Sequence, residues 1–115
     1  METSSIRQAI RAGTTVRGAH LIYPAPRVVE VLAALDLDFI YLDGEHGAFS
    51  PSDLAQHAFM LKQLGITPIA RVPDNSRATI THFLDRGVRG IVVPHVESVE
   101  DAIHELGGAS TIAPV

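Results

Sequence analysis

The apolar residues of the chain fall into short continuous runs that alternate with longer segments of helical periodicity. Four runs have the length and composition of strands: residues 16–23, 39–42, 67–71 and 90–93. In the segment after each run, apolar residues recur at spacings of three and four, which is typical of an amphipathic helix. A short helix over residues 6–13 precedes the first run. The pattern therefore predicts four strand–helix units.

Start signals mark three of these helices, and Ser98 is interpreted as the cap of the one after the fourth strand. Ser50, Pro51 and Asp53 supply an N-cap residue, a proline at the first helical position and an acid in the first turn. Asp74 and Asn75 are interpreted as capping residues of the helix after the third strand.

Strands that alternate with helices predict right-handed crossovers and a parallel sheet. No GxGxxG or GxxxxGK[ST] motif follows any strand, so a nucleotide-binding open sheet is not favoured. Polar residues follow the strand ends instead: Asp43, His46, Arg71 and His95. Barrels of parallel strands gather their active-site groups at this edge. We therefore predict an α/β fold made of parallel (β/α) units of a TIM-type barrel, a half-barrel with about four of the eight units.

The segment FIYLDGEHGAFS, residues 39–50, carries the densest candidate chemistry. Its four large leading residues predict a strand that is buried on both faces. Asp43, Glu45 and His46 follow within four positions, and two glycines among them allow a sharp turn and the close approach of a ligand. A polar loop with a solvated acid pair is the alternative interpretation.

Composition narrows the classes of function. The 115 residues carry a formal net charge of -4, and the arginines form no basic cluster, so nucleic acid is not an expected partner. No apolar run approaches the ~20 residues of a membrane-spanning helix, and the N-terminus has no signal-peptide core. We expect a soluble, cytoplasmic protein. Because the chain has no cysteine, a metal ion would need oxygen or imidazole ligands.

His46 is the first candidate for proton transfer, because an ordinary imidazole with a pKa of ~6.5 exchanges protons at neutral pH. His20 and His95, on or just after predicted strands, remain open candidates for the same site. The other three histidines fall within predicted helices, where partly exposed or helix-boundary positions are expected: His57, His82 and His104.

Arg71 ends an otherwise apolar strand, and its guanidinium offers a rigid fork of donors for a substrate carboxylate or a developing enolate. The alternative is a salt bridge to Asp43 or Glu45. The only lysine, Lys62, lies late in a predicted helix, away from every strand end, which argues against a Schiff-base mechanism. Carbonyl chemistry would then rely on a metal ion.

Asp85 lies in the last turn of its predicted helix, where a negative charge opposes the helix dipole. A compensating partner is therefore expected. It is either Arg86 or Arg89, or an imidazole that the carboxylate orients.

Three motifs, LDGEHG, PIARVPDN and FLDRGVRGIVVPHVESVEDA, closely resemble the HpcH/HpaI aldolase/citrate lyase family of metal-dependent barrel enzymes. The resemblance covers residues 12–106. It implies a class II, pyruvate-type aldolase that makes or cleaves a carbon–carbon bond between a 2-oxo acid enolate and an aldehyde. The implied cofactor is Mg²⁺, Mn²⁺ or a similar divalent ion.

The resemblance also implies roles for individual residues. His46 is the general base, and Asp85 supports it. Arg71 binds the oxo acid and steadies its enolate. Asp43 helps to order the site and its metal-bound water, whereas Glu45 receives no individual role.

The family's two metal-binding carboxylates belong to later strands, so the expected ligands lie beyond Val115. Residues 107–115 form a tail that departs from the family pattern. We therefore interpret residues 1–115 as the truncated N-terminal half of the barrel, and expect no full activity from this chain alone.

Two alternatives to the aldolase remain open. One is an acyl-CoA lyase of the same superfamily that acts on a malyl or citramalyl thioester. The other is a noncatalytic module in which two half-barrels pair to bury their open edges, which would give a homo-oligomer.

Overall fold

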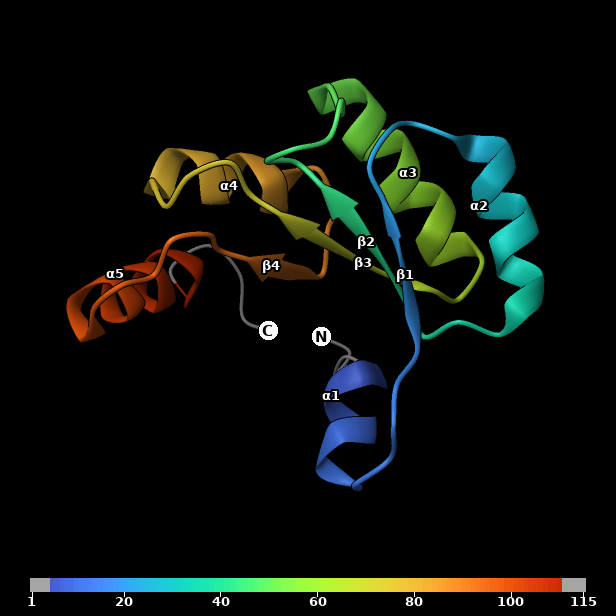
Figure 1. Cartoon of the computed structure of the whole chain (residues 1–115), viewed down its shortest axis with the longest axis horizontal. Helices are drawn as coiled ribbons and strands as arrows, with labels where there is room; N and C mark the ends of the chain where they lie inside the picture. Colours follow the sequence, from blue (N-terminus) through green and yellow to red (C-terminus); the bar gives the residue numbers. More distant parts are fainter. Residues whose placement is uncertain (1–4, 111–115) are drawn as a thin grey trace.

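A computed structural model describes the backbone of residues 5–110 and the side chains of residues 6–104. Four parallel strands form one sheet in the order of the sequence (Figure 1): β1 (Gly18–Leu21), β2 (Phe39–Asp43), β3 (Thr67–Arg71) and β4 (Gly90–Val92). The helices are α1 (Ser5–Arg11), α2 (Pro26–Leu32) with the short 3-10 helix η1 (Ala33–Leu35), α3 (Pro51–Gln63), α4 (Arg77–Asp85) and α5 (Val99–Ser110). The predicted four β/α units, half of a TIM-type barrel, are confirmed.

The first strand is shorter than predicted, because β1 pairs with β2 only from Gly18 to Leu21. The first predicted helix after a strand is divided into α2 and η1, and Asp36 ends η1 in the left-handed conformation with a φ of 57°. The third strand has the predicted limits.

The core lies between the sheet and its helices. Ile40, Leu42 and Ala70 point to this side and are buried. They pack with buried residues of α2 and α3: Val29, Leu54, Ala58 and Leu61. Alternate strand residues, Phe39 and Tyr41 among them, point the other way and are only partly buried.

The prediction that β2 is buried on both faces is therefore wrong. In the part of the chain that the structure describes, helices cover one face. The opposite face, called the inner face below, carries Tyr41, Asp43 and Arg71.

α3 begins as predicted. Ser50 Oγ accepts a hydrogen bond from Asp53 N at 3.1 Å, and the Asp53 carboxylate accepts one from Ser50 N at 3.2 Å, which completes a capping box. For α4 the N-cap is Ser76, whose Oγ accepts from Thr79 N. Asp74 instead accepts from Ser76 N, so the prediction that Asp74 and Asn75 cap this helix needs correction.

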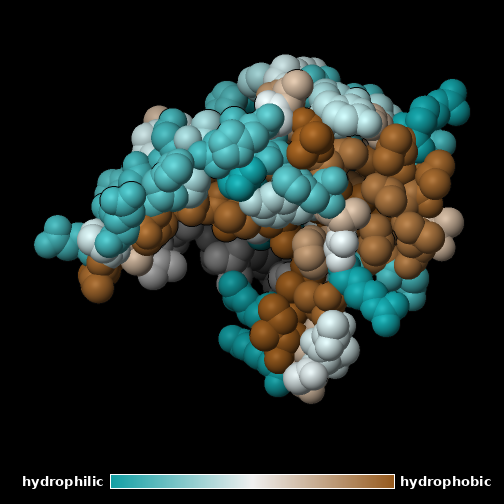
Figure 2. Space-filling model, viewed as in Figure 1, coloured by the Kyte–Doolittle hydropathy of each residue, from teal (hydrophilic) through white to brown (hydrophobic). Residues whose placement is uncertain are grey.

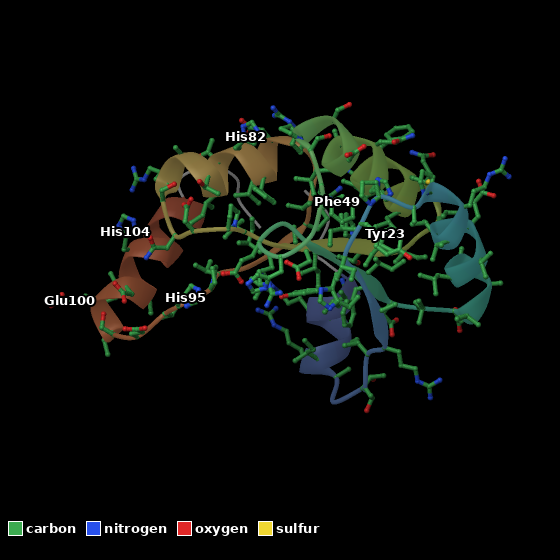
Figure 3. All side chains as sticks on the ribbon, turned by 45° about the horizontal axis from the view of Figure 1, so that its top comes forward. Tyr23, Phe49, His82, His95, Glu100 and His104 are labelled. Atoms are coloured by element: carbon green, nitrogen blue, oxygen red, sulfur yellow. The ribbon has the colours of Figure 1, made fainter. Side chains whose placement is uncertain are left out.

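His57 is fully buried in α3, contrary to the expected partly exposed or helix-boundary position. Its Nε2 accepts a hydrogen bond from Ala25 N at 3.0 Å, and its Nδ1 lies 2.7 Å from Asp53 O. A carbonyl oxygen only accepts, so Nδ1 carries the proton. Both ring nitrogens are satisfied by backbone groups, which lets the ring join the core. His82 and His104 are exposed on α4 and α5, as expected (Figure 3).

α5 continues to Ser110, so residues 107–110 of the predicted atypical tail are helical, and residues 111–115 lie outside the described part. Apolar surface gathers on the side of the molecule where α2 lies (Figure 2), and the side chains of Val31 and Leu35 there are exposed. None of the described helices has the length and apolar character needed to span a membrane.

Candidate active site

The ends of β2 and β3 bring an acid and an arginine together. Asp43 and Arg71 are the last residues of these strands and lie opposite each other in the parallel register. Arg71 Nε donates to Asp43 Oδ1 at 3.2 Å, and Arg71 Nη2 donates to Oδ2 at 2.5 Å. The Asp43 side chain is only 1% exposed, so this paired fork forms in a site largely shielded from water.

The turn after β2 completes the surroundings of Asp43. The backbone N–H groups of Glu45 and His46 donate to Oδ1 at 3.0 and 2.9 Å. Burial alone would raise the pKa of Asp43, but hydrogen bonds from Arg71 and from these two N–H groups hold that pKa well below its ordinary value. Asp43 is therefore a carboxylate at neutral pH.

Two glycines permit this turn for steric reasons. A Cβ on Gly44 would lie 2.6 Å from Arg71 O, and a Cβ on Gly47 would collide with the carbonyl oxygens of Asp43 and Ile22. The sequence suggested that these glycines let a ligand come close. In the structure, the groups that approach them are backbone and side-chain atoms of the protein itself.

His20 also contacts the buried carboxylate. Its Nε2 lies 3.1 Å from Asp43 Oδ2, and its side chain is 46% exposed. The ring meets Tyr41 edge-on with centroids 4.6 Å apart, and Arg71 Cζ lies 5.8 Å from the centroid of the Tyr41 ring. Burial raises the pKa of Tyr41. Tyr41 thus supports both His20 and Arg71 on the inner face.

His46 accepts a hydrogen bond from Arg71. The distance from Arg71 Nη2 to His46 Nδ1 is 3.0 Å. Because guanidinium only donates, Nδ1 must present its lone pair, and a neutral His46 carries its proton on Nε2. Glu45 Oε1 lies 3.7 Å from the same Nδ1, too long for a hydrogen bond.

Glu45 joins Arg71 to the loop after β4. One oxygen lies 3.3 Å from Arg71 Nε, and the other lies 3.1 Å from His95 Nε2. His95 has a φ of 59°, the left-handed conformation that side chains adopt rarely. Figure 3 shows His95 on this loop, apart from His82 and His104 on the neighbouring helices.

The structure places the predicted site residues in two groups. Asp43, His46 and Arg71 come together, and both alternatives for Arg71, the salt bridges to Asp43 and Glu45, are present. Asp85 is exposed at the end of α4, and among the described residues it has no hydrogen bond or ion pair with His46.

From the sequence, His20 and His95 were open candidates for the site, and Tyr41 was not predicted to be part of it. The signal for Tyr41 is its spacing of two residues from Asp43, which puts both side chains on the same face of β2.

The described residues do not fit a metal site by themselves. The oxygens of Asp43 and Glu45 are directed to Arg71, His20 and His95. In residues 6–104 no three His, Asp or Glu side chains are grouped so that they could hold an ion.

Comparisons with known proteins identify the family of the chain. The family model "HpcH/HpaI aldolase/citrate lyase" matches residues 20–106. A "4-hydroxy-2-oxovalerate aldolase" of Novosphingobium aromaticivorans is 34% identical over 103 residues, covering 86% of this chain and 38% of the relative. A "5-keto-4-deoxy-D-glucarate aldolase" of Salmonella paratyphi A is 32% identical, covering 96% of this chain and 43% of the relative.

Solved structures give the same fold. The HpcH/HpaI aldolase from Desulfitobacterium hafniense DCB-2 superposes with a TM-score of 0.84 at 27% identity, over 93% of this chain and 42% of that chain. The citrate synthase SbnG superposes with a TM-score of 0.82 at 35% identity, over 90% of this chain and 42% of that chain. The chain spans about two fifths of the length of these relatives.

Proposed function

Because the chain belongs to the HpcH/HpaI aldolase/citrate lyase family, we propose that it carries the oxo-acid half of a pyruvate-type aldolase site. The reaction is the cleavage or formation of a carbon–carbon bond between a 2-oxo acid enolate and an aldehyde. The observation that carries this proposal is the Arg71 guanidinium, fixed by buried Asp43 at the edge of the sheet with part of its donor set unused.

Arg71 has donors available for a substrate. Its Nε and Nη2 face Asp43, and the second N–H of Nη2 reaches His46. Among the described residues, Nη1 has no hydrogen-bond partner, and the side chain is 24% exposed. A substrate carboxylate would take the Nη1–Nη2 edge as a bidentate ligand, the geometry that guanidinium favours.

Binding at this edge would activate His46. The carboxylate would replace His46 as the acceptor of the Nη2 proton, and the lone pair of Nδ1 would then be free to accept a proton. Substrate binding and the availability of the base are therefore coupled through one guanidinium. The freed imidazole would remove the hydroxyl proton of the aldol, the carbon–carbon bond would break, and the electron pair would form the enolate beside Arg71.

We extend the proposal to the complete enzyme, where a divalent ion such as Mg²⁺ or Mn²⁺ would polarise the carbonyl. Its ligands would lie beyond Val115, since the described residues do not fit the ion. By resemblance, Asp85 remains the proposed support of His46. Because the two side chains make no hydrogen bond or ion pair among the described residues, this support would have to involve groups outside them.

The test combines this chain with a separately expressed C-terminal half of a family aldolase. The mixture should cleave a 4-hydroxy-2-oxo acid to pyruvate in a lactate dehydrogenase-coupled assay with added Mg²⁺ or Mn²⁺, and neither part should do so alone. Arg71→Lys should abolish most of the turnover because lysine lacks the fork. Robust turnover by the chain alone, or a mixture without turnover, would contradict the proposal.

A noncatalytic pairing module is the second candidate. It is favoured by the partly exposed inner face and by β1 and β4, each of which has only one strand neighbour among the described residues. Two copies that cover these edges would form a homo-oligomer. Native mass spectrometry tests this, because a dimer that resists dilution and does not respond to pyruvate supports the module, and a monomer contradicts it.

A further inference from the structure

We propose that His20 is a second acid–base residue of this site and exchanges a proton with C3 of the 2-oxo acid, while His46 serves the hydroxyl group. This role rests on the proposed aldolase function. It assigns a task to a histidine that lies outside the three motifs and that contacts the site through Asp43.

The position of His20 follows from the strand register. His20 in β1 lies opposite Tyr41 in β2, so both side chains project from the inner face. His20 Nε2 and Arg71 Nη2 lie 3.1 and 2.5 Å from the same atom, Asp43 Oδ2. A substrate held by Arg71 would therefore lie next to the His20 ring.

Asp43 fixes the protonation pattern of His20. Because Asp43 is an ionised, acceptor-only carboxylate, Nε2 of His20 must donate. The neutral ring then presents the lone pair of Nδ1, and the charged ring presents an N–H there. This is the arrangement in which a buried aspartate orients a catalytic histidine and fixes which ring nitrogen carries the proton. At 46% exposure, the ring remains open to a ligand.

The two histidines divide two proton transfers. After His46 takes the hydroxyl proton and the carbon–carbon bond breaks, the enolate holds an electron pair at C3. The Nδ1–H of charged His20 gives its proton to C3, which forms the methyl group of pyruvate and leaves His20 neutral. His46 loses its proton to water and His20 regains one from water, so the cycle is balanced in protons. In reverse, His20 Nδ1 removes a C3 proton from bound pyruvate.

The first measurement uses the chain alone and does not depend on turnover. In a long-range ¹H–¹⁵N spectrum, we expect neutral His20 to carry its proton on Nε2. In Asp43→Asn the ring should lose this preference. A neutral His20 with its proton on Nδ1 would overturn the proposal.

The second measurement follows exchange of the pyruvate methyl protons in D₂O by NMR, with the chain and the complementary half combined. We choose His20→Gln because the glutamine N–H can still donate to Asp43. Exchange should fall by about 10²- to 10⁴-fold, the usual contribution of a positioned acid–base group, with pyruvate affinity unchanged. His46→Gln should keep exchange and lose carbon–carbon cleavage, and His82→Gln on the surface of α4 should change neither.

The outcomes separate the two proposals. Unchanged exchange in His20→Gln, with active wild-type protein, overturns the role of His20 and leaves the proposed function standing. A loss of pyruvate affinity that matches the loss of exchange would reduce His20 to a structural residue and overturn its acid–base role. Wild-type mixtures that neither exchange nor cleave would overturn the proposed function and this role with it.

Discussion

Replacing Asp43 by asparagine tests whether the buried carboxylate organises the site. Asparagine has nearly the same shape, so the backbone N–H groups of Glu45 and His46 keep an oxygen acceptor at the Oδ1 position. The amide NH₂ group replaces Oδ2, however, and it would face two donors, Arg71 Nη2 and His20 Nε2. The variant therefore loses two hydrogen bonds that involve a charged group.

The size of the effect follows from these two contacts. A hydrogen bond to a charged group contributes about 1.5–3 kcal/mol, so we expect the loss of two in Asp43→Asn to lower the free energy of unfolding by roughly 3–6 kcal/mol. That is a large part of the ~5–15 kcal/mol that stabilises a typical domain. For a domain of this size it corresponds to a decrease in Tm of about 12–24 °C.

Urea unfolding followed by circular dichroism at pH 7 measures this change. Asp36→Asn is the matched control, because Asp36 is exposed, has no hydrogen bond or ion pair among the described residues, and occupies a left-handed position that asparagine tolerates. The control should stay within about 0.5 kcal/mol of wild type. A loss below about 1 kcal/mol in Asp43→Asn, with a normal control, would refute the reasoning.

Three further predictions concern the turn, the core and the response to acid. Gly47→Ala should lower the free energy of unfolding, measured in urea, by about 1–3 kcal/mol, because the new Cβ meets the rigid carbonyl oxygens of Asp43 and Ile22. An unchanged free energy would contradict this and show that the turn relaxes. His57→Leu should lower the free energy of unfolding in the same assay by about 1–3 kcal/mol or more, because it leaves the Ala25 N–H without its acceptor. Equal or higher stability would contradict this. The folded-state pKa of Asp43 lies below its ordinary value, so the contribution of Asp43 to the free energy of unfolding should be complete above about pH 4 and should be lost as the pH falls further. Acid titrations should show that this part of the dependence of stability on pH disappears in Asp43→Asn.

Local pattern was enough to predict the strand–helix order, because each unit carries its own periodicity and end signals. Ser50 and Asp53 identified the start of α3, and the polar residues after β2 and β3 identified the edge where the site lies. These features depend on neighbours in the sequence. The parallel topology then follows from general rules of chain connection.

Features that depend on distant partners were not predictable in the same way. His57 is buried because Ala25, 32 positions away, donates to its ring. His20 joins the site because β1 and β2 pair in one particular register, which no local pattern specifies. The exposure of the inner face likewise depends on what covers it, and the helices that pack on the core of the sheet, α2 and α3, lie on the other side.

Asp85 illustrates a limit of motif transfer. The motif fixes its place in the sequence, but among the described residues its carboxylate, exposed at the end of α4, makes no hydrogen bond or ion pair with His46. An arginine is easier to place than such a helix residue, because Arg71 ends a strand and strand ends share one edge of the sheet.

The coupling of oxo-acid binding to His46 through Arg71 is the central claim, and ¹⁵N NMR of the His46 ring tests it directly. In the free chain, Nδ1 should have the shift of a nitrogen that accepts a hydrogen bond. Saturating pyruvate should move that signal toward the value of an unbonded nitrogen, and Arg71→Lys should show no such response to pyruvate. An Nδ1 signal that stays unchanged while pyruvate binds the wild-type chain would contradict the account.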